Sequence, residues 1–406
     1  MEDAGRIPVI RVGVLGLITI SVYGSWYYAF GVLLDAIILD TGWEEPVLTT
    51  AFAGSLLVGG VGSLAGGLIL DRLGSRLVFG VAALLGLVAF QVAGLTESSA
   101  VFAVAVALGG GAYAALGFYH VTQTAAVRIS PEASVKAIAV LTIWGAFASA
   151  IYIPLAAWMV DNSGWRPTLR ILTMTAAVAL IFGALVVDTR VEKAPRARLV
   201  VSELRASLRR PATRRFVIAV ALIGIGVSTI LVYQVPAMTA AGLSLGAASF
   251  WAGFRGFAQL GGRLPLMPIV SRLGIAGSLR LAVGAITFGI LVLAVAGTTW
   301  LAAIYALVAG FGIGALSPLQ GMRAQEVFGA SSLGTAMGLL TFLFLVAGAI
   351  GPAVAGVIAS ATGSRALPVA AGAAATLGAA LLLRSPNRAD EGPGPSKAPH
   401  PGLTEL

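Results

Sequence analysis

The most regular feature of this sequence is a series of long apolar stretches separated by short polar breaks. Each stretch has roughly 18 or more residues, the length that an α-helix needs to cross a membrane. We predict twelve such spans, at residues 12–39, 47–70, 77–95, 99–127, 135–160, 167–187, 216–241, 246–271, 277–296, 299–322, 333–360 and 366–384. The pattern therefore predicts an all-α membrane protein with twelve transmembrane helices.

A basic segment in the middle of the chain divides these spans into two groups of six. Two six-helix halves are typical of transporters that bind their substrate near the membrane midplane. The last residues are rich in proline, glycine and charge, a composition typical of disorder. We predict an N-terminal six-helix half at 1–188, a basic cytoplasmic linker at 189–215, a C-terminal six-helix half at 216–385 and a disordered cytoplasmic tail at 386–406.

The composition supports this class. Hydrophobic residues make up 58% of the 406 positions and charged residues only 11%, which excludes an ordinary soluble protein. The polar start leads directly into a full-length span, unlike a cleaved signal peptide with its short apolar core. The absence of cysteine excludes disulfides, thiolate metal sites and cysteine nucleophiles.

The distribution of the basic residues predicts the orientation. If the N-terminus is cytoplasmic, only Arg166, Arg170 and Arg365 of the 26 Lys and Arg residues fall on the outer side. An excess of basic residues on one side marks the cytoplasmic face of a membrane protein. We therefore predict a multi-pass protein of a bacterial-type plasma membrane with both termini in the cytoplasm. The net charge of +9 then reflects orientation in a lipid bilayer and indicates no nucleic-acid partner.

A charged turn between the second and third spans carries the clearest motif. In "GGLILDRLGSR", five positions match the pattern G-x-x-x-D-[RK]-x-G-x-[RK]: Gly67, Asp71, Arg72, Gly74 and Arg76. This turn resembles the loop 2–3 signature of the major facilitator superfamily. The resemblance implies a cytoplasmic gate, in which charge pairs hold the halves together while the outer side is open. The alternative is an ordinary basic loop on the cytoplasmic side.

The corresponding turn of the second half preserves part of the same motif. In "PLMPIVSRLG", Arg272 and Gly274 match, whereas Ser271 replaces the acid and Met267 replaces the first glycine. The partial match indicates an internal repeat and predicts that the gate depends mainly on Asp71.

Other segments resemble one branch of that superfamily, the monocarboxylate porters and oxalate–formate antiporters. They are "YYAFGVLLDAIILDTGW", "LGFYHVTQTAAVR", "NSGWRP" and "RAQEVFGASSLGTAMGLL". In the last, Arg323 and Glu326 are three residues apart, so they can pair on one helix face. We interpret them as a cytoplasmic gate or a structural charge pair.

Two arginines interrupt the eighth span, in "GFRGFAQLGGR". Arg255, Gln259 and Arg263 are spaced four apart and therefore share one helix face. An arginine in hydrocarbon costs on the order of 3 kcal/mol, so a hydrated central cavity is the cheaper environment. A planar guanidinium suits a carboxylate, which predicts an organic-anion site. The alternative is charge pairing with Asp35.

The resemblance favours Arg263 among these residues. Monocarboxylate porters carry an acid in this span, followed four residues later by an arginine that serves substrate and proton coupling. Arg263 matches that arginine, but Gln259 occupies the acid's position, and Tyr28 corresponds to a lysine of animal members. The anion-binding part of the motif is therefore present, and the family's route for proton coupling is not. Asp35 and His120 remain as candidates for proton coupling.

Further candidates for substrate contact are Trp26, Tyr28, Tyr233, Gln234 and His120, all of which lie within spans. Phenol and amide groups can donate hydrogen bonds to a carboxylate, although aromatic residues in membrane helices are also common packing residues. Histidine exchanges a proton near neutral pH, but a neutral, hydrogen-bonded imidazole is the alternative for His120.

Together these features predict a secondary active transporter for a small organic anion, working by alternating access as a symporter or antiporter. The alternative is efflux of a drug or other amphiphile, although two buried arginines suit a cationic drug poorly. A membrane receptor is disfavoured because the sequence shows no soluble signalling domain. No phosphate-binding loop and no metal-ligand spacing occurs, so we expect no enzyme activity and no cofactor. No obligate protein partner is indicated.

Overall fold

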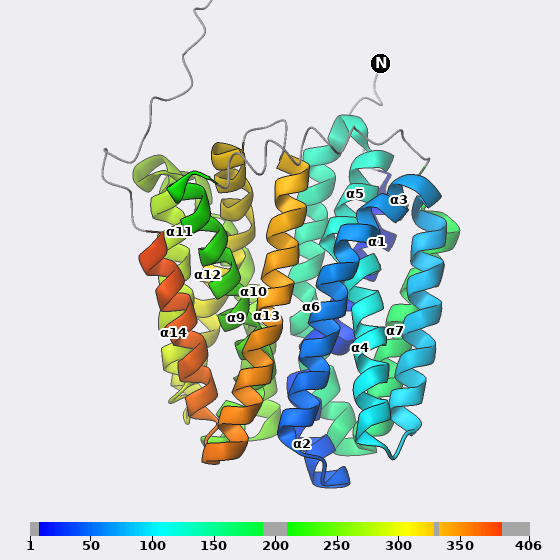
Figure 1. The fold of residues 1–406 in the computed structure, drawn as a ribbon, viewed down its shortest axis with the longest axis vertical. Helices are drawn as coiled ribbons and strands as arrows, with labels where there is room; N and C mark the ends of the chain where they lie inside the picture. The colour runs from blue at the N-terminus through cyan, green and yellow to red at the C-terminus, as the bar shows by residue number, and fades with distance from the viewer. Residues whose placement is uncertain (1–7, 190–208, 329–332, 384–406) are drawn as a thin grey trace, which may run out of the picture.

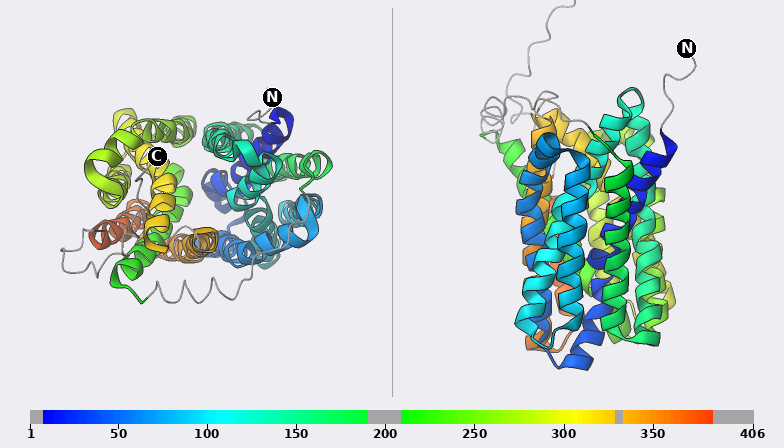
Figure 2. Two further views of the ribbon diagram at one scale, coloured as in Figure 1. Left: turned by 90° about the horizontal axis from the view of Figure 1, so that it is seen from above. Right: turned by 90° about the vertical axis from the view of Figure 1, so that its right-hand side faces the viewer.

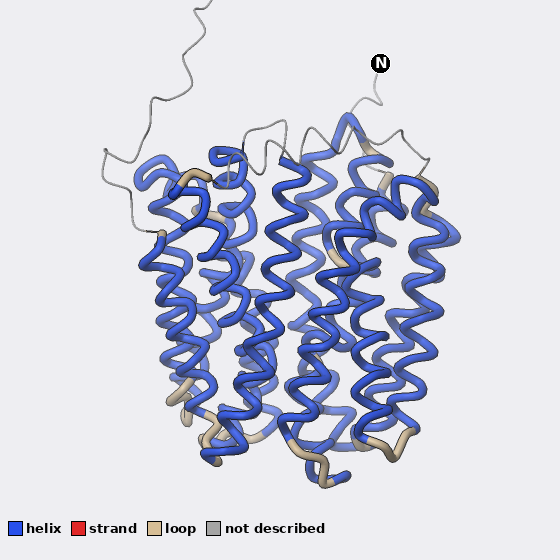
Figure 3. Tube along the Cα trace, viewed as in Figure 1, coloured by secondary structure: helices blue, strands red, loops and turns tan. Residues whose placement is uncertain are grey.

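The computed structural model describes residues 8–189, 209–328 and 333–383, and every regular element in these ranges is helical. Figure 3 shows helices joined by short connections throughout this part of the chain. The predicted tail and most of the predicted linker lie outside the described residues.

The elements of the N-terminal half form a compact group of long helices. They are α1 (Val9–Val22), the π-helix η1 (Tyr23–Tyr28), α2 (Phe30–Thr41), α3 (Glu45–Leu95), α4 (Ser99–Gly117), α5 (Tyr119–Ile129), the short 3-10 helix η2 (Pro131–Ala133), α6 (Ser134–Ser163) and α7 (Trp165–Val186).

The C-terminal half has a matching set. Its elements are α9 (Pro211–Ala240), α10 (Leu245–Arg263), α11 (Leu266–Leu293), α12 (Thr299–Phe328), α13 (Leu333–Thr362) and α14 (Ala366–Leu382).

Ten helical segments of the described chain are long and apolar enough to cross a membrane. Two more complete the set: α14, which has 17 residues, and α10, whose arginines and glutamine make it the most polar of the long helices. The predicted all-α membrane fold is therefore confirmed, and the described helices fit the predicted number of twelve spans in two six-helix halves.

The two halves stand side by side as two bundles (Figures 1 and 2). We call the end of the molecule that holds the start of α1 the upper end, as drawn in Figure 1, and the end that holds the α2–α3 connection the lower end. The halves meet where α3 packs against α13 and where α6 packs against α10. The two halves therefore contact each other mainly through these four helices.

The same turn occurs at equivalent places in the two halves. Gly74 interrupts α3 with φ 75° and ψ 169°, and Gly274 interrupts α11 with φ 68° and ψ 172°. Backbone with positive φ strongly favours glycine. This requirement explains why the second copy of the motif keeps its glycine although Ser271 replaces the acid.

Two helices are irregular at mid-depth. The first span changes from α-helix to π-helix over Tyr23–Tyr28, and the fourth is broken at Phe118, whose ψ is 175°. Irregular backbone inside a membrane is tolerated where protein or a water-filled cavity surrounds it, and π-turns are frequent at functional sites. Hydrophobic periodicity predicts both spans as continuous helices, because it does not report such local changes in winding.

Close packing of α11 on α12 provides a first test. A Cβ atom at Gly312 would lie 2.6 Å from the carbonyl oxygen of Ala282, whereas a Cβ at Gly284 would meet nothing within 4 Å. Overpacking costs typically about 1–3 kcal/mol. We expect Gly312→Ala to lower the apparent Tm in detergent by roughly 3 °C or more. Gly284→Ala is the matched control and should leave it unchanged; equal effects would contradict this packing.

Candidate functional site

Arg255 lies between the halves and is almost fully buried, with 1% of its surface exposed. Its Nε donates a hydrogen bond to Oε1 of Gln234 at 3.1 Å. The hydroxyl of Tyr305 donates to the same oxygen at 2.8 Å. The three side chains come from α10, α9 and α12, so the site needs all three helices.

Two donors of this cluster have no hydrogen-bond acceptor among the described residues. They are Nη2 of Arg255 and Nε2 of Gln234, and both are buried. Burying a polar group without a partner costs on the order of 1–3 kcal/mol, and more when it is charged. Such atoms are rare in folded proteins and need an explanation. Since both are donors, what they require is an acceptor, such as a carboxylate oxygen.

Tyrosines of the π-helix η1, in the N-terminal half, lie near this cluster. Tyr27 and Tyr28 both lie within electrostatic range of Arg255. Tyr28 also lies within electrostatic range of Arg263, so it is near both arginines. Tyr27 is buried and Tyr28 half-buried. The winding of η1 thus brings two phenols next to the arginines of α10.

Arg263 is a bridge between the halves. Its Nη1 donates to the carbonyl oxygen of Thr142 in α6 at 2.7 Å, and its Nε donates to that of Gly314 in α12 at 3.3 Å. Tyr119, which follows the break at Phe118, is a hydrogen-bonding neighbour of the same guanidinium. Arg263 is half-buried, and its bonds to two carbonyls make it better satisfied than Arg255.

Glycines hold α10 close to its neighbours. A Cβ at Gly256 would collide with Ser149 and Ala146 of α6, and one at Gly262 would collide with the backbone of Phe311 in α12. The alternation of glycine and polar residues in "GFRGFAQLGGR" therefore has two purposes. The glycines allow tight packing, and the arginines reach the space between the halves. Gln259 is also buried, with 8% of its surface exposed.

Two predicted contact residues lie elsewhere in the N-terminal half. Nε1 of Trp26 donates to Ser55 at 3.1 Å, and its ring packs among phenylalanines of the same half. His120 bonds through Nε2 to the carbonyl oxygen of Ala115 at 2.8 Å. That carbonyl belongs to the last turn of α4, where carbonyls lack intrahelical donors. The packing and neutral-histidine alternatives fit these two positions.

A charged cluster joins the halves at the lower end. Nη2 of Arg365 lies 2.7 Å from Asp35, and its Nη1 contacts Glu45. The hydroxyl of Tyr233 donates to Glu45 at 2.5 Å. Asp35 thus pairs with Arg365, and this pair replaces the alternative of pairing with an arginine of the eighth span.

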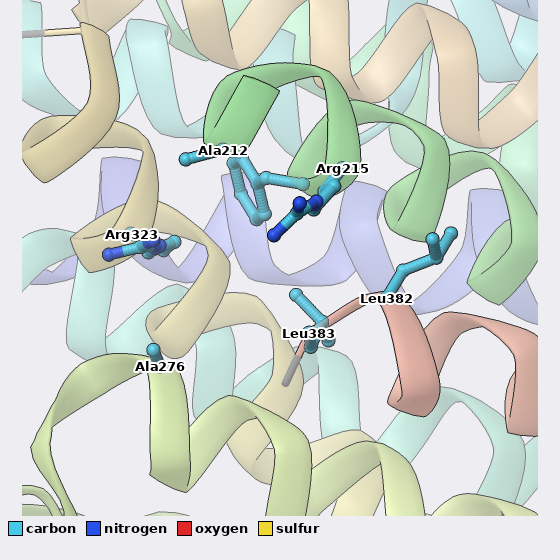
Figure 4. Close-up of a pocket in the computed structure, with 7 residues that line it drawn as sticks. Ala212, Arg215, Ala276, Arg323, Leu382 and Leu383 are labelled. Atoms are coloured by element: carbon cyan, nitrogen blue, oxygen red, sulfur yellow. The ribbon is translucent and has the colours of Figure 1, made fainter. Parts of the chain in front are cut away.

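The predicted gate residues lie at the upper end. Arg76 lies 3.6 Å from Asp188, and Arg323 lies 2.7 Å from Glu326, each pair within one half. Gly74 forms the turn described above, whereas the side chains of Asp71 and Arg72, and the surroundings of Gly67, lie outside the described part of the structure. Figure 4 shows Arg323 in a small pocket of this end. Its other lining residues are Ala212, Arg215, Phe216, Ala276, Leu382 and Leu383.

Sequence reasoning missed three residues of these clusters: Tyr305, Glu45 and Arg365. Tyr305 is the only tyrosine of its span, and Glu45 is an acid in the first turn of a helix that starts next to a proline. Both are weak signals in a single sequence. The sequence gives no signal for the pairing of Arg365, because its acidic partners are more than 300 residues away in the chain.

A family model described as Major Facilitator Superfamily matches residues 15–352 and 281–406 of the chain. No curated protein matches the sequence significantly.

Solved structures of transporters share the fold. The nucleoside transporter NupG superposes with a TM-score of 0.74 at 14% identity, covering 92% of this chain and 97% of that one. A D-xylose-proton symporter gives 0.70 at 16% identity, covering 93% and 97%. A POT family peptide transporter gives 0.66 at 15% identity, covering 92% and 96%. At these identities the likeness shows the fold alone.

Stability measurements can separate a binding role of Arg255 from a structural one. We expect Arg255→Met to change the apparent Tm in detergent by no more than about 2 °C, because it removes a buried charge with an unpartnered nitrogen. Trp26→Phe is the comparison, since it loses the bond to Ser55 and should cost about 1 kcal/mol. A larger fall for Arg255→Met than for Trp26→Phe would show that Arg255 serves mainly the fold.

Proposed function

Because this chain belongs to the major facilitator superfamily, we propose that it is a secondary active transporter that carries a small organic anion, a carboxylate, by alternating access. The family match supports the transporter class, and the proposed substrate class comes from the site between the halves. Both symport and antiport fit this proposal.

The observation that carries the proposal is the pair of buried, unpartnered donors in the central cluster. Nη2 of Arg255 and Nε2 of Gln234 belong to side chains joined by a hydrogen bond. A carboxylate offers two acceptor oxygens and a negative charge, and a guanidinium binds it through parallel N–H groups. A neutral ligand would leave the buried positive charge uncompensated, which is costly in a low-dielectric site.

We assign the primary anion contact to Arg255 and a second contact to Arg263. The resemblance to monocarboxylate porters favours Arg263, but its guanidinium already bonds the carbonyls of Thr142 and Gly314. The bond to Thr142 crosses from α10 to α6 and must change when the halves move, whereas the bond to Gly314 stays within the C-terminal half. Arg263 is therefore suited to link anion binding to that movement. Tyr28, a neighbour of both arginines, is the proposed contact for the rest of the ligand.

The alternative of drug or amphiphile efflux has one supporting observation. A small aromatic pocket inside the N-terminal half is lined by apolar residues such as Trp26, Tyr27, Tyr113 and Phe118. This pocket lies beside the π-helix and contains no acid, so it does not suit an organic cation. The transport experiment below therefore tests this alternative with a neutral amphiphile as substrate.

We place the upper end in the cytoplasm. Arg76 and Arg272 flank the two glycine turns at this end, as the excess of basic residues on the cytoplasmic face requires. The lower end then faces outward. In this orientation the contacts of Arg365 with Asp35 and Glu45 close the outer side.

Reconstituted transport tests the proposal. Proteoliposomes should take up or exchange labelled monocarboxylates or dicarboxylates, with lactate and oxalate as first members, in a saturable way. Arg255→Gln should lower the rate at low substrate concentration roughly 10- to 150-fold, because a hydrogen bond to a charged group is worth about 1.5–3 kcal/mol. Arg263→Gln should also lower it.

Arg280→Gln is the control, because Arg280 is exposed on α11 and its loss removes the same charge. A nucleoside, D-xylose and a neutral amphiphile serve as uncharged comparators. Saturable transport of one of these, with no anion transported under any imposed gradient, would contradict the anion assignment. Full activity of Arg255→Gln would remove that residue's role.

A further inference from the structure

The lower-end cluster joins the halves through charges that do not balance. From the N-terminal half come two carboxylates, Asp35 of α2 and Glu45 of α3. From the C-terminal half come one guanidinium, that of Arg365, and the hydroxyl of Tyr233. With both acids ionised, a closed cluster holds one uncompensated negative charge.

This charge is costly because Glu45 and Arg365 are largely shielded from water. The side chains of Glu45 and Arg365 are 12% and 20% exposed, whereas that of Asp35 is 40% exposed. Two carboxylates that share one site ionise together only at a cost, since like charges repel and burial disfavours the charged form. The partial exposure of Asp35 gives a proton access from the lower side.

Within the described ranges, the groups around the cluster do not supply the missing positive charge. On α2, Asp40 is engaged by Trp165 at 2.8 Å and by Arg166 at 3.7 Å, and Arg166 also pairs with Glu97. Glu44 precedes Glu45 and is exposed. The sequence of α13 and α14 contains no ionisable side chain, and in the lower part of α9 the only phenol is that of Tyr233.

We propose that Asp35, Glu45, Tyr233 and Arg365 form a proton-linked latch, in which the two carboxylates hold one exchangeable proton while the lower end is closed. One proton from water on the lower side binds a carboxylate oxygen of the pair and makes the closed cluster neutral. When the halves separate at this end, both acids become hydrated and the proton returns to water. Low pH therefore favours the closed lower end, and high pH favours the open one.

The latch is linked to the central site through two adjacent residues of α9. Tyr233 bonds Glu45 in the latch, and Gln234 bonds Arg255 in the centre. Pro236 follows directly in the same helix, where it removes a backbone hydrogen bond. A movement of this turn therefore affects both clusters. This supplies a route for coupling that needs no acid at Gln259.

The inference rests on the transporter part of the proposed function and not on the anion, so its test contains no substrate. Since the chain has no cysteine, pairs of cysteines can carry spin labels without background. Leu39 on α2 and Leu367 on α14 are exposed and report on the lower end. Leu73 and Leu273 are exposed beside the two glycine turns and report on the upper end.

Distances between the labels are measured by pulsed electron paramagnetic resonance on the full chain in lipid nanodiscs. In the wild type, the ratio of short to long lower-end distances should rise roughly threefold or more from about pH 8.5 to about pH 5.5. The upper-end pair should change in the opposite sense. A lower-end distribution that is independent of pH overturns the proposal.

Four variants identify the groups responsible. Asp35→Asn and Glu45→Gln imitate the protonated pair and should keep the lower end closed at every pH. Arg365→Gln leaves two acids without a cation and should open it at neutral pH. Asp40→Asn is the matched control and should behave as wild type. If the pH response persists in both Asp35→Asn and Glu45→Gln, or disappears in Asp40→Asn, the latch is assigned wrongly. Transport of an anion, or its absence, leaves this result unaffected.

Discussion

The burial of one guanidinium between two helical bundles is the constraint on which this structure depends. A charge removed from water costs several kcal/mol unless other groups compensate it. In the described part of the chain, the groups around Arg255 are neutral: the oxygen of Gln234, which Tyr305 also contacts, and the phenols of η1. The site is thus stable enough to exist, yet it keeps a positive charge that an anion can neutralise.

Small residues and helix breaks place the other groups around this charge. Gly256 and Gly262 bring α10 against α6 and α12, and Gly31 brings α2 against the backbone of α9 beside the latch. The π-helix η1 and the break at Phe118 turn tyrosines toward α10, where regular helices would direct other side chains. Close packing and irregular winding together create a polar centre inside an apolar fold.

The sequence predicted part of this site. The four-residue spacing of Arg255, Gln259 and Arg263 placed them on one face, and Gln234 was among the candidates. The resemblance favoured Arg263, whereas in the structure Arg263 bonds two carbonyls and Arg255 keeps an unpartnered nitrogen. Which nitrogens find partners in other helices cannot be read from local spacing. Residue type alone made Trp26 and His120 candidates for substrate contact. In the structure, their hydrogen-bond partners, Ser55 and Ala115, lie within the same half of the protein.

The sequence by itself determined the class of membrane protein and predicted twelve spans divided into two halves. The length of the apolar stretches and the distribution of basic residues are local properties, and they decide directly how a chain inserts into a bilayer. The sequence also showed the repeated motif with Gly74 and Gly274, which the structure uses at two positive-φ turns that strongly favour glycine. Only the tertiary structure decided that Arg365 faces Asp35 and Glu45, and that Tyr233 and Gln234 contact different clusters. Such pairings join residues that are distant in the chain, and side-chain desolvation selects them only after the helices have packed.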